Sequence, residues 1–217
     1  MTPEVKIRVI PPRHNISEII NFRYKVFILE SHFNPSTANH SEESLTDDLD
    51  LYSYQLVAEN KSGIIYGSVR ITFFKDLPKK IYQSNFLFNQ LPATVFVNNN
   101  FANHSYSSKL ASSRQYKGKF PILFESEGFE QCHFLSIGGA LCEAVFLFAR
   151  KNLIEYDWIK CNNHNKKYYQ RLGYDMYKNN IDDPEYADDH NWGKTNIMKL
   201  ELSNPKSKVS PFNKYLI

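Results

Sequence analysis

A run of apolar residues from Phe134 to Ala149 is the feature that most limits how this chain can fold. The run holds 16 residues and includes Gly138, Gly139 and Glu143. A membrane-spanning helix needs about 20 apolar residues, so we expect a buried helix over residues 134–152 instead. Because this helix is apolar nearly all round, other elements should pack against more than one of its faces.

The chain is long enough for one hydrophobic core, since 42% of its 217 residues are apolar. We therefore expect a single domain over residues 1–217. A charged fraction of 23% is typical of a folded protein. The net charge of +3 is far below that of a dedicated nucleic-acid-binding protein, so we expect no nucleic-acid partner. A mildly basic chain would suit an acidic partner or a phosphate-bearing co-substrate.

The cysteines and the N-terminal residues bear on the cellular compartment. The three cysteines are odd in number and none are at metal-finger spacing, which favours a reducing compartment over a disulfide scaffold. Residues 1–14 contain three prolines and no apolar segment, unlike a signal peptide. These features predict a cytoplasmic protein with no membrane span. The histidines have no spacing that suggests a metal site.

Hydrophobic periodicity and turn residues predict the remaining elements. The expected helices cover residues 15–27, with Asn15 or Ser17 as cap, residues 81–91, and residues 166–172, with Asn163 or Asn165 as cap. The expected strands cover residues 5–10, 54–59, 64–74, 109–116, 157–161 and 196–202. The polar stretch 31–48 is long for a connector, so it is either mobile or functional. This order predicts an α/β fold, a mixed central sheet with helices on both faces.

Several short motifs follow one another along the chain. They are Asn-Phe-Arg-Tyr-Lys-Val-Phe at 21–27, Asp-Asp-Leu-Asp at 47–50, Leu-Val-Ala-Glu at 56–59 with Gly-Ser-Val-Arg at 67–70, Ser-Ser-Arg at 112–114, and the segment 163–174 that ends in Arg-Leu-Gly-Tyr. Their order and spacing resemble the GNAT N-acyltransferase fold, and within it the autoinducer (acyl-homoserine-lactone) synthases and the long-chain N-acyl amino acid synthases. The resemblance covers roughly Ile16 to Leu202.

Three positions depart from the pattern of these families. Ala111 stands where they have a glutamate, Phe33 is the nearest aromatic residue to an expected tryptophan, and residues 115–120 supply one glycine to the expected Gly-rich loop. The ending at 163–174 looks closer to the N-acyl amino acid synthases. The resemblance therefore implies transfer of a fatty acyl chain from acyl carrier protein or acyl-CoA to the amine of a small amino-acid-like acceptor, with no tightly bound cofactor.

Two other functions remain open at this point. The first is an autoinducer synthase that makes an acyl-homoserine lactone from S-adenosylmethionine. The second belongs to another class: a catalytically degenerate GNAT fold kept as a binding or regulatory protein. Ala111 and the missing glycines favour this second alternative.

The resemblance also assigns charged residues to the reaction. Asp47 or Asp50 would hold or deprotonate the acceptor amine, whereas the alternative is an acidic turn that caps a strand. Arg70 and Arg114 would bind a substrate carboxylate or Asp50, and the alternative is a structural ion pair. Arg23 would contact substrate or simply fix the first helix.

Uncharged and loop residues complete the predicted site. Tyr169 would protonate the leaving thiolate or be an ordinary aromatic core residue. Lys117, Gly118 and Lys119 would cradle a pantetheine phosphate or form a plain polar turn. The resemblance adds a substrate-binding wall of Phe27, Phe33, Ser112 and Ser113. Six phenylalanines would line an acyl tunnel or belong to the core: Phe73, Phe74, Phe86, Phe88, Phe146 and Phe148. The basic cluster Lys166, Lys167 and Arg171 would dock acyl carrier protein or face solvent.

Overall fold

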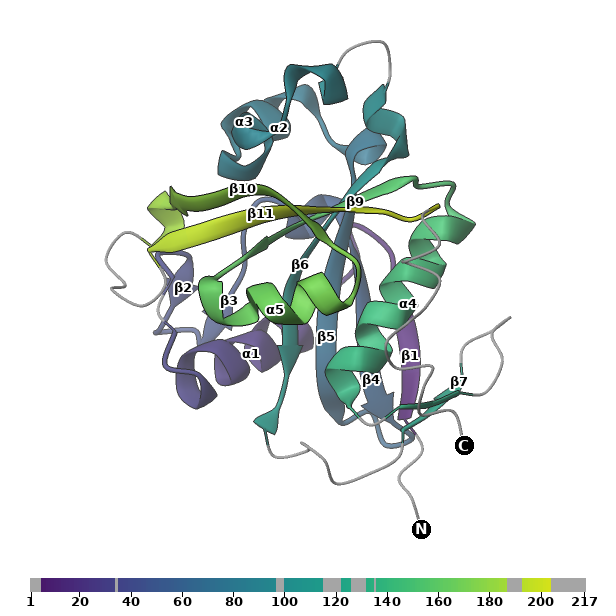
Figure 1. The fold of residues 1–217 in the computed structure, drawn as a ribbon. Helices are drawn as coiled ribbons and strands as arrows, with labels where there is room; N and C mark the ends of the chain where they lie inside the picture. Colours follow the sequence, from purple (N-terminus) through teal and green to yellow (C-terminus); the bar gives the residue numbers. More distant parts are fainter. Residues whose placement is uncertain are drawn as a thin grey trace.

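The computed structural model describes residues 5–33, 35–96, 100–114, 122–125, 132–134, 136–186 and 193–203. Within these residues, nine strands form one mixed sheet in the order β10-β11-β9-β6-β5-β4-β1-β7-β8 (Figure 1). None of the helices in these residues is long and apolar enough to span a bilayer. Because some of these strands pair in parallel and others antiparallel, the predicted mixed sheet is confirmed.

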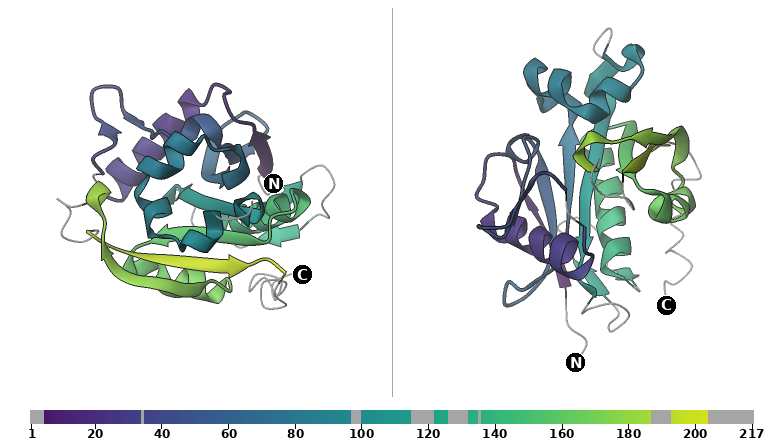
Figure 2. Two further views of the ribbon diagram at one scale, coloured as in Figure 1. Left: turned by 90° about the horizontal axis from the view of Figure 1, so that it is seen from above. Right: turned by 90° about the vertical axis from the view of Figure 1, so that its left-hand side faces the viewer.

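The first half of the sheet is antiparallel and follows the predicted hairpin. Its strands are β1 (Val5–Ile10), β4 (Tyr54–Asn60), β5 (Ile65–Phe73) and β6 (His104–Ser112). Gly63 adopts a positive φ of 79° in the turn between β4 and β5, a conformation that glycine adopts without strain. Helix α1 (Ser17–Tyr24) continues as a π-helix over Lys25–Glu30 and covers one face of these strands (Figure 2). Ile19 of α1 packs on Ile10 and Val57 of that face.

The remaining strands lie on the two sides of this antiparallel part. Beyond β6 they are β9 (Tyr156–Cys161), β11 (Lys194–Glu201) and β10 (Asp175–Asp182), and beside β1 they are β7 (Ile122–Glu125) and β8 (Cys132–Phe134). Helices α4 (Ile137–Lys151) and α5 (Asn163–Arg171) lie on the face opposite α1 (Figure 2). Ala140, Leu141 and Ala149 of α4 are fully buried against the sheet, as the apolar run predicts. Cys142 belongs to the same core.

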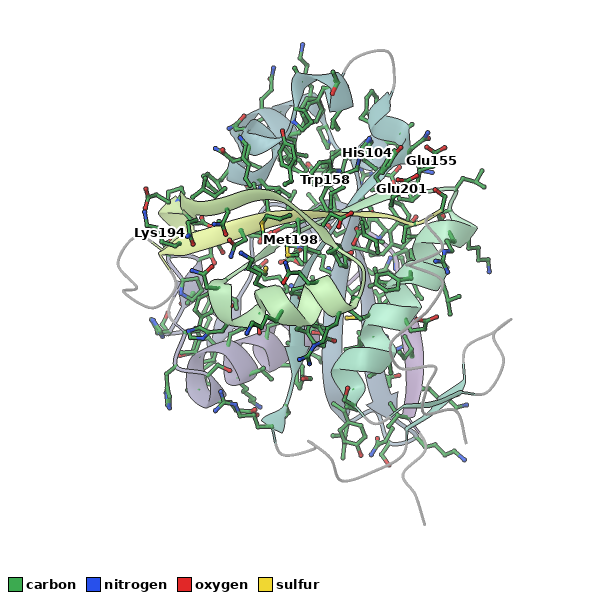
Figure 3. The ribbon with its side chains drawn as sticks, in the orientation of Figure 1. His104, Glu155, Trp158, Lys194, Met198 and Glu201 are labelled. Atoms are coloured by element: carbon green, nitrogen blue, oxygen red, sulfur yellow. The ribbon has the colours of Figure 1, made fainter. Side chains whose placement is uncertain are left out.

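Short elements complete the fold. They are β2 (Ala38–Asn39), β3 (Ser44–Leu45), α2 (Lys79–Ser84), α3 (Phe86–Gln90) and the 3-10 helices η2 (Asp50–Tyr52), η3 (Phe74–Asp76), η4 (Ala93–Phe96), η5 (Asn100–Asn103) and η7 (Pro184–Tyr186). Helices α2 and α3 cap one end of the sheet over an aromatic cluster (Figure 1). In that cluster Trp158 Nε1 donates to His104 Nδ1 at 2.8 Å, and the two rings lie together under the cap (Figure 3). Burial lowers the pKa of His104 to about 4, so this ring is a neutral core group.

Several predicted boundaries were wrong. Strand β6 begins at His104 rather than 109, because the buried Ser105 and Ser107 do not give the apolar alternation by which a strand is recognised. The cap of α5 is Asn162, whose Oδ1 accepts from the backbone N–H of Asn165 at 2.9 Å. Asn85 divides the single helix expected over residues 81–91, because its side chain caps α3.

Other differences concern elements that carry little apolar pattern. The buried helix begins at Ile137, after the cap Ser136, because residues up to Phe134 belong to β8. The stretch expected to be a connector contains the hairpin β2–β3. Strand β10 was not predicted, since it is an edge strand with mostly exposed polar residues.

A buried carboxyl in the core makes stability depend on pH. Asp157 is 0% exposed and accepts hydrogen bonds from Ser105 Oγ at 2.6 Å, Ser107 Oγ at 3.0 Å and Tyr174 Oη. Burial raises its pKa to about 6. As the pH rises, the unfolded chain loses this proton near pH 4, whereas the folded chain keeps it up to about pH 6. The free energy of unfolding should therefore decrease by up to about 3 kcal/mol as the pH rises from 4 to 6.

We expect Asp157→Asn to remove that part of the pH dependence. Urea unfolding at several pH values between 4 and 7 would measure it, with wild type and variant side by side. The same slope in both proteins would show that Asp157 does not titrate in this interval.

Candidate active site

Two neighbouring parallel strands separate in the middle of the sheet. Residues His104–Ser107 of β6 pair with Tyr156–Ile159 of β9. Beyond that point β6 continues beside β5 up to Ser112, whereas β9 continues beside β11. The sheet therefore contains a V-shaped gap, open toward the carboxyl ends of both strands.

A β-bulge on β6 lies at the start of this gap. Ser68 pairs with Ala111 and Arg70 pairs with Ser108, so Lys109 and Leu110 stand opposite the single residue Val69. Lys109 has a positive φ of 53°, which is strained for a residue with a side chain. A bulge of this kind bends the strand and turns backbone groups out of the ladder.

A cavity of about 310 Å³ lies between the end of β6, the first residues of α4 and helix α5. Its wall is formed by Leu110, Ser112, Ser113, Ser136, Ile137, Gly138, Asn165, Tyr168 and Tyr169. Helix α4 begins here, and Ser136 Oγ caps it by accepting from the N–H of Gly139 at 3.1 Å. The first turn of a 15-residue helix favours an anionic group, because its N–H groups and dipole point toward that end.

A second cavity, of about 1100 Å³, adjoins the first. Leu110, Asn165 and Tyr169 line both cavities and separate them. The larger cavity has an apolar region formed by Ile16, Ile20, Phe27, Phe33 and Leu45. It also has a charged wall formed by Asp47, Asp50, Arg70, Lys109, Lys160, Asp183 and Glu185. Apolar lining with convergent polar groups is typical of small-molecule sites.

Two arginines hold the two predicted aspartates. Arg70 donates to both oxygens of Asp47, with Nη2 to Oδ2 at 3.0 Å, and its Nη1 lies 3.1 Å from Asp50 Oδ1. Arg23 Nη1 donates to Asp50 Oδ1 at 2.7 Å. Asp50 Oδ2 also accepts from Thr46 Oγ1 at 3.0 Å. The two motifs that contribute Arg23 and Asp50 therefore meet in one buried network.

Both aspartates are held as anions. Burial alone would raise the pKa of Asp47, but Arg70 and Lys109 outweigh it and lower the pKa below its ordinary value. The pKa of Asp50 is likewise lowered, because Arg23 and Arg70 outweigh burial. A carboxylate of such low pKa is a weak general base near neutral pH. The hypothesis that either aspartate deprotonates the amine is thus not supported, whereas Asp47, with a side chain 21% exposed, is able to hold an ammonium group.

A second ion network crosses the gap. Lys109 Nζ donates to Glu185 Oε1 at 3.1 Å and lies 3.6 Å from Asp47 Oδ2. Lys160 Nζ donates to Glu185 Oε2 at 2.7 Å and lies 2.8 Å from Asp183 Oδ2. Within the described residues, no group of three His, Cys, Asp or Glu side chains is arranged to hold a metal ion.

The structure brings most of the predicted site residues together. Asp47, Asp50, Arg70, Phe27, Phe33 and Tyr169 line the larger cavity, and Ser112, Ser113 and Tyr169 line the smaller one. Arg23 is fully buried and forms an ion pair with Asp50. Lys117, Gly118 and Lys119 lie outside the described residues.

Arg114 is the exception. It is exposed and does not line either cavity, so the expected grouping of Arg114 with Arg70 and Asp50 was wrong. Its backbone N–H and the Ser113 hydroxyl both donate at 2.7 Å to the carboxylate of Glu30. This carboxylate therefore holds the end of β6 and leaves the guanidinium turned to solvent.

The phenylalanines expected in a tunnel or core divide unequally. Phe73, Phe74, Phe88 and Phe146 are buried in the aromatic and aliphatic clusters, and Phe148 packs at the edge of one. Phe86 is the member of this set that lines the larger cavity. Lys166 lies within reach of Asn179 Oδ1 at 3.2 Å and, with Lys167 and Arg171, belongs to the outer side of α5.

Sequence reasoning missed Lys109, Lys160, Asn162, Asp183 and Glu185. A lysine at 160 within an apolar strand was a usable signal, because a buried ammonium requires a partner. Asn162 was not recognised because its neighbours Asn163 and Asn165 offered competing caps. It is 5% exposed, and its Nδ2 has no hydrogen-bond partner among the residues that the structure describes. Its Oδ1 is fixed by the cap, so the free end of the amide is a donor.

Comparison with known proteins supports this fold at low sequence identity. No protein-family model and no curated protein matches the chain. The AHL synthase LasI is 16% identical with a TM-score of 0.62, and 99% of this chain and 98% of that one are covered. The N-acyl amino acid synthase FeeM from uncultured soil microbes is 12% identical with a TM-score of 0.57, and 93% and 92% are covered.

An acyl-CoA N-acyltransferase from Pseudomonas aeruginosa is 15% identical, with a TM-score of 0.54 and coverage of 91% of this chain and 99% of that one. The chain has the GNAT N-acyltransferase fold. The predicted fold class and the resemblance to the folds of autoinducer and N-acyl amino acid synthases are thereby confirmed.

Proposed function

We propose that the protein is an N-acyltransferase that moves a fatty acyl chain from acyl carrier protein or acyl-CoA to the amine of a small amino-acid-like acceptor. The observation that carries this proposal is the gap between β6 and β9. Both strands line the larger cavity, which has a charged wall and an apolar region, and this cavity adjoins the smaller one at the start of α4. The names of the structures that share the fold support the same reaction type.

The smaller cavity would receive the thioester arm of the donor. The N–H groups at the start of α4, beside Ser136 and Gly138, would bind its polar atoms. The bulge at Lys109 would direct backbone N–H groups toward the oxyanion of the tetrahedral intermediate. No tightly bound cofactor is part of this proposal, since the donor is a co-substrate.

The larger cavity would receive the acceptor and the acyl chain. Asp47 would hold the acceptor as an ammonium ion, and Lys109 would attract a carboxylate on the same molecule. The chain would lie along Phe27 and Phe33, whose rings pack at 5.9 Å. The ammonium loses one proton to solvent, and the neutral amine attacks the thioester carbonyl. A C–N bond forms, the C–S bond breaks, the nitrogen gives up its second proton, and the thiolate takes one proton.

Tyr169 would supply that last proton. It lines both cavities, and burial raises the pKa of its phenol well above 10, so the hydroxyl stays protonated. We expect Tyr169→Phe to lower kcat on the order of 10²-fold, because a positioned general acid typically contributes at least that much. The decrease should be smaller with a donor whose thiol is more acidic.

Tyr168→Phe is the matched control. The Tyr168 hydroxyl lines only the smaller cavity and lies 3.4 Å from Cys142 Sγ. Steady-state rates for both variants would decide the point. Equal rates for Tyr169→Phe and wild type, with unchanged circular dichroism, would show that Tyr169 is not the general acid and is an aromatic core residue.

The experiment that tests the function combines thiol release with product mass spectrometry. The purified protein is incubated with acyl-CoA or acylated carrier protein and a panel of amino acids and amines. We expect one thiol released per N-acyl amide formed. A lactone product from S-adenosylmethionine would instead identify an autoinducer synthase. No turnover over the whole panel would favour a binding protein with a degenerate site.

The compartment proposed for this reaction is the cytoplasm. Cys142 and Cys161 are free buried thiols, which fits a reducing environment.

A further inference from the structure

One carboxylate joins the two strands that separate at the gap. Glu185 lies in η7, which follows β10 in the chain. Its Oε1 accepts from Lys109 of β6 at 3.1 Å, and its Oε2 accepts from Lys160 of β9 at 2.7 Å. Each oxygen therefore binds a different strand.

These contacts lie where the backbone pairing stops. The last paired residues of β6 and β9 are Ser107 and Ile159. Lys160 is the next residue on β9, and Lys109 is the second residue after the pair on β6 and belongs to the bulge. The Glu185 carboxylate thus spans the gap at its apex, where no ladder hydrogen bond between the two strands holds their separation.

Glu185 is itself held from several sides. Its backbone N–H donates to Asp183 Oδ1 at 3.1 Å, and its carbonyl accepts from the N–H of Ser36 at 3.2 Å. The second lysine, Lys160, also contacts Asp183 at 2.8 Å. The bridge is therefore anchored to Asp183, which directly precedes η7, and to the stretch after Pro35.

The bridge is largely shielded from water. The side chains of Lys109, Lys160 and Glu185 are 9%, 11% and 20% exposed. The two lysines lower the pKa of Glu185 against the effect of burial, and Tyr106, Glu185 and Asp183 together raise the pKa of Lys160 against burial. Ion pairs with little exposure are screened far less than pairs on the surface.

We propose that Glu185 is a positioning residue that sets the width of the gap between β6 and β9 and fixes the Lys109 ammonium at the cavity wall. What the gap receives rests on the function proposed above, but the bridge itself does not. Displacing β6 relative to β9 would shift the bulge against the start of α4. A misplacement of about 1 Å can lower a reaction rate on the order of 10²-fold.

Two measurements on Glu185→Gln test this role. The first is amide hydrogen exchange of the full chain, which reports strand opening whether or not a substrate is known. We expect residues 108–112 of β6 and 160–161 of β9 to exchange on the order of tenfold faster, with α4 unchanged. The second is steady-state kinetics, in which kcat should fall on the order of tenfold or more while KM for the amine changes less.

Asp182→Asn is the matched control, because Asp182 is in the same hairpin and pairs with Lys194 at 2.5 Å on the surface. Lys194 lies at the outer end of β11 (Figure 3), and the two side chains are 55% and 86% exposed. This control should leave both measurements unchanged. Lys160→Met should be at least as severe as Glu185→Gln, because it removes the bridge and also the contact of Lys160 with Asp183. The double variant should be no worse than Lys160→Met alone, since the bridge is already absent there.

The outcomes separate the two proposals. Unchanged exchange at 108–112 in Glu185→Gln would overturn the bridge, whatever the protein catalyses. Faster exchange with an unchanged kcat in an active enzyme would overturn the positioning role. An inactive wild-type protein would count against the proposed function alone, since the exchange result still decides whether Glu185 holds the gap.

Discussion

Arg70→Met should lower the free energy of unfolding by about 3–5 kcal/mol, the usual loss when one partner of a buried ion pair is removed. Arg70 is 1% exposed and binds both oxygens of Asp47 while also facing Asp50. Without it, these two aspartates would repel each other in a buried place, with Arg23 as the remaining arginine beside Asp50. Urea unfolding followed by circular dichroism measures the loss.

Arg8→Met is the control for this prediction. Arg8 also forms a two-oxygen ion pair, with Glu59, but its side chain is 48% exposed. An exposed pair contributes at most about 1 kcal/mol. If Arg8→Met and Arg70→Met lowered the free energy of unfolding equally, burial would not be the reason for the strength of the Arg70 network.

The same network predicts an acid dependence. The pKa values of Asp47 and Asp50 are lowered in the folded state, so their contribution to stability is present above the unfolded pKa of about 3.9. It is lost as the pH falls below that value, because both groups must then be protonated. The loss on acidification should be smaller in Arg70→Met than in wild type.

Much of the fold was predictable because its helices and strands follow from patterns of apolar residues that are close together in the sequence. The apolar run around Leu141 specified a buried helix, and the alternating residues on both sides of Gly63 specified the β4–β5 hairpin. Asp47 and Arg70 were predicted as site residues from the motifs that they resemble. Their direct pairing is a contact between residues 23 positions apart, which the sequence alone left as one of several possibilities.

The bridge across the gap was not predictable in this way. Lys109 and Glu185 are 76 positions apart, and they meet only because β6, β9 and η7 are brought together by the order of strands in the sheet.

Arg114 shows the converse error. Its motif placed it in the site, but Glu30 binds the adjoining backbone and leaves its side chain exposed. The start of β6 was missed because Ser105 and Ser107 are polar and do not look like buried strand residues. They are buried nonetheless, because the Asp157 carboxylate accepts their hydrogen bonds.

Gly138→Leu should block the donor while leaving the fold intact. A Cβ at residue 138 would lie 3.8 Å from Tyr168 Oη and 4.0 Å from Ser112 Oγ, which is ordinary contact. The rest of a leucine side chain would extend into the cavity of about 310 Å³ at the start of α4. Glycine within a helix costs roughly 1 kcal/mol relative to alanine, so the variant should be at least as stable as wild type.

The central claim is that a thioester arm enters between β6 and β9 at the start of α4. Calorimetric titration with a non-hydrolysable acyl-pantetheine thioether, the part common to both possible donors, tests it most directly. We predict binding to wild type and to the remote turn variant Gly63→Asn, and at least about tenfold weaker binding to Gly138→Leu at an equal or higher Tm. Equal affinity in Gly138→Leu and wild type, or no binding to wild type, would contradict the claim.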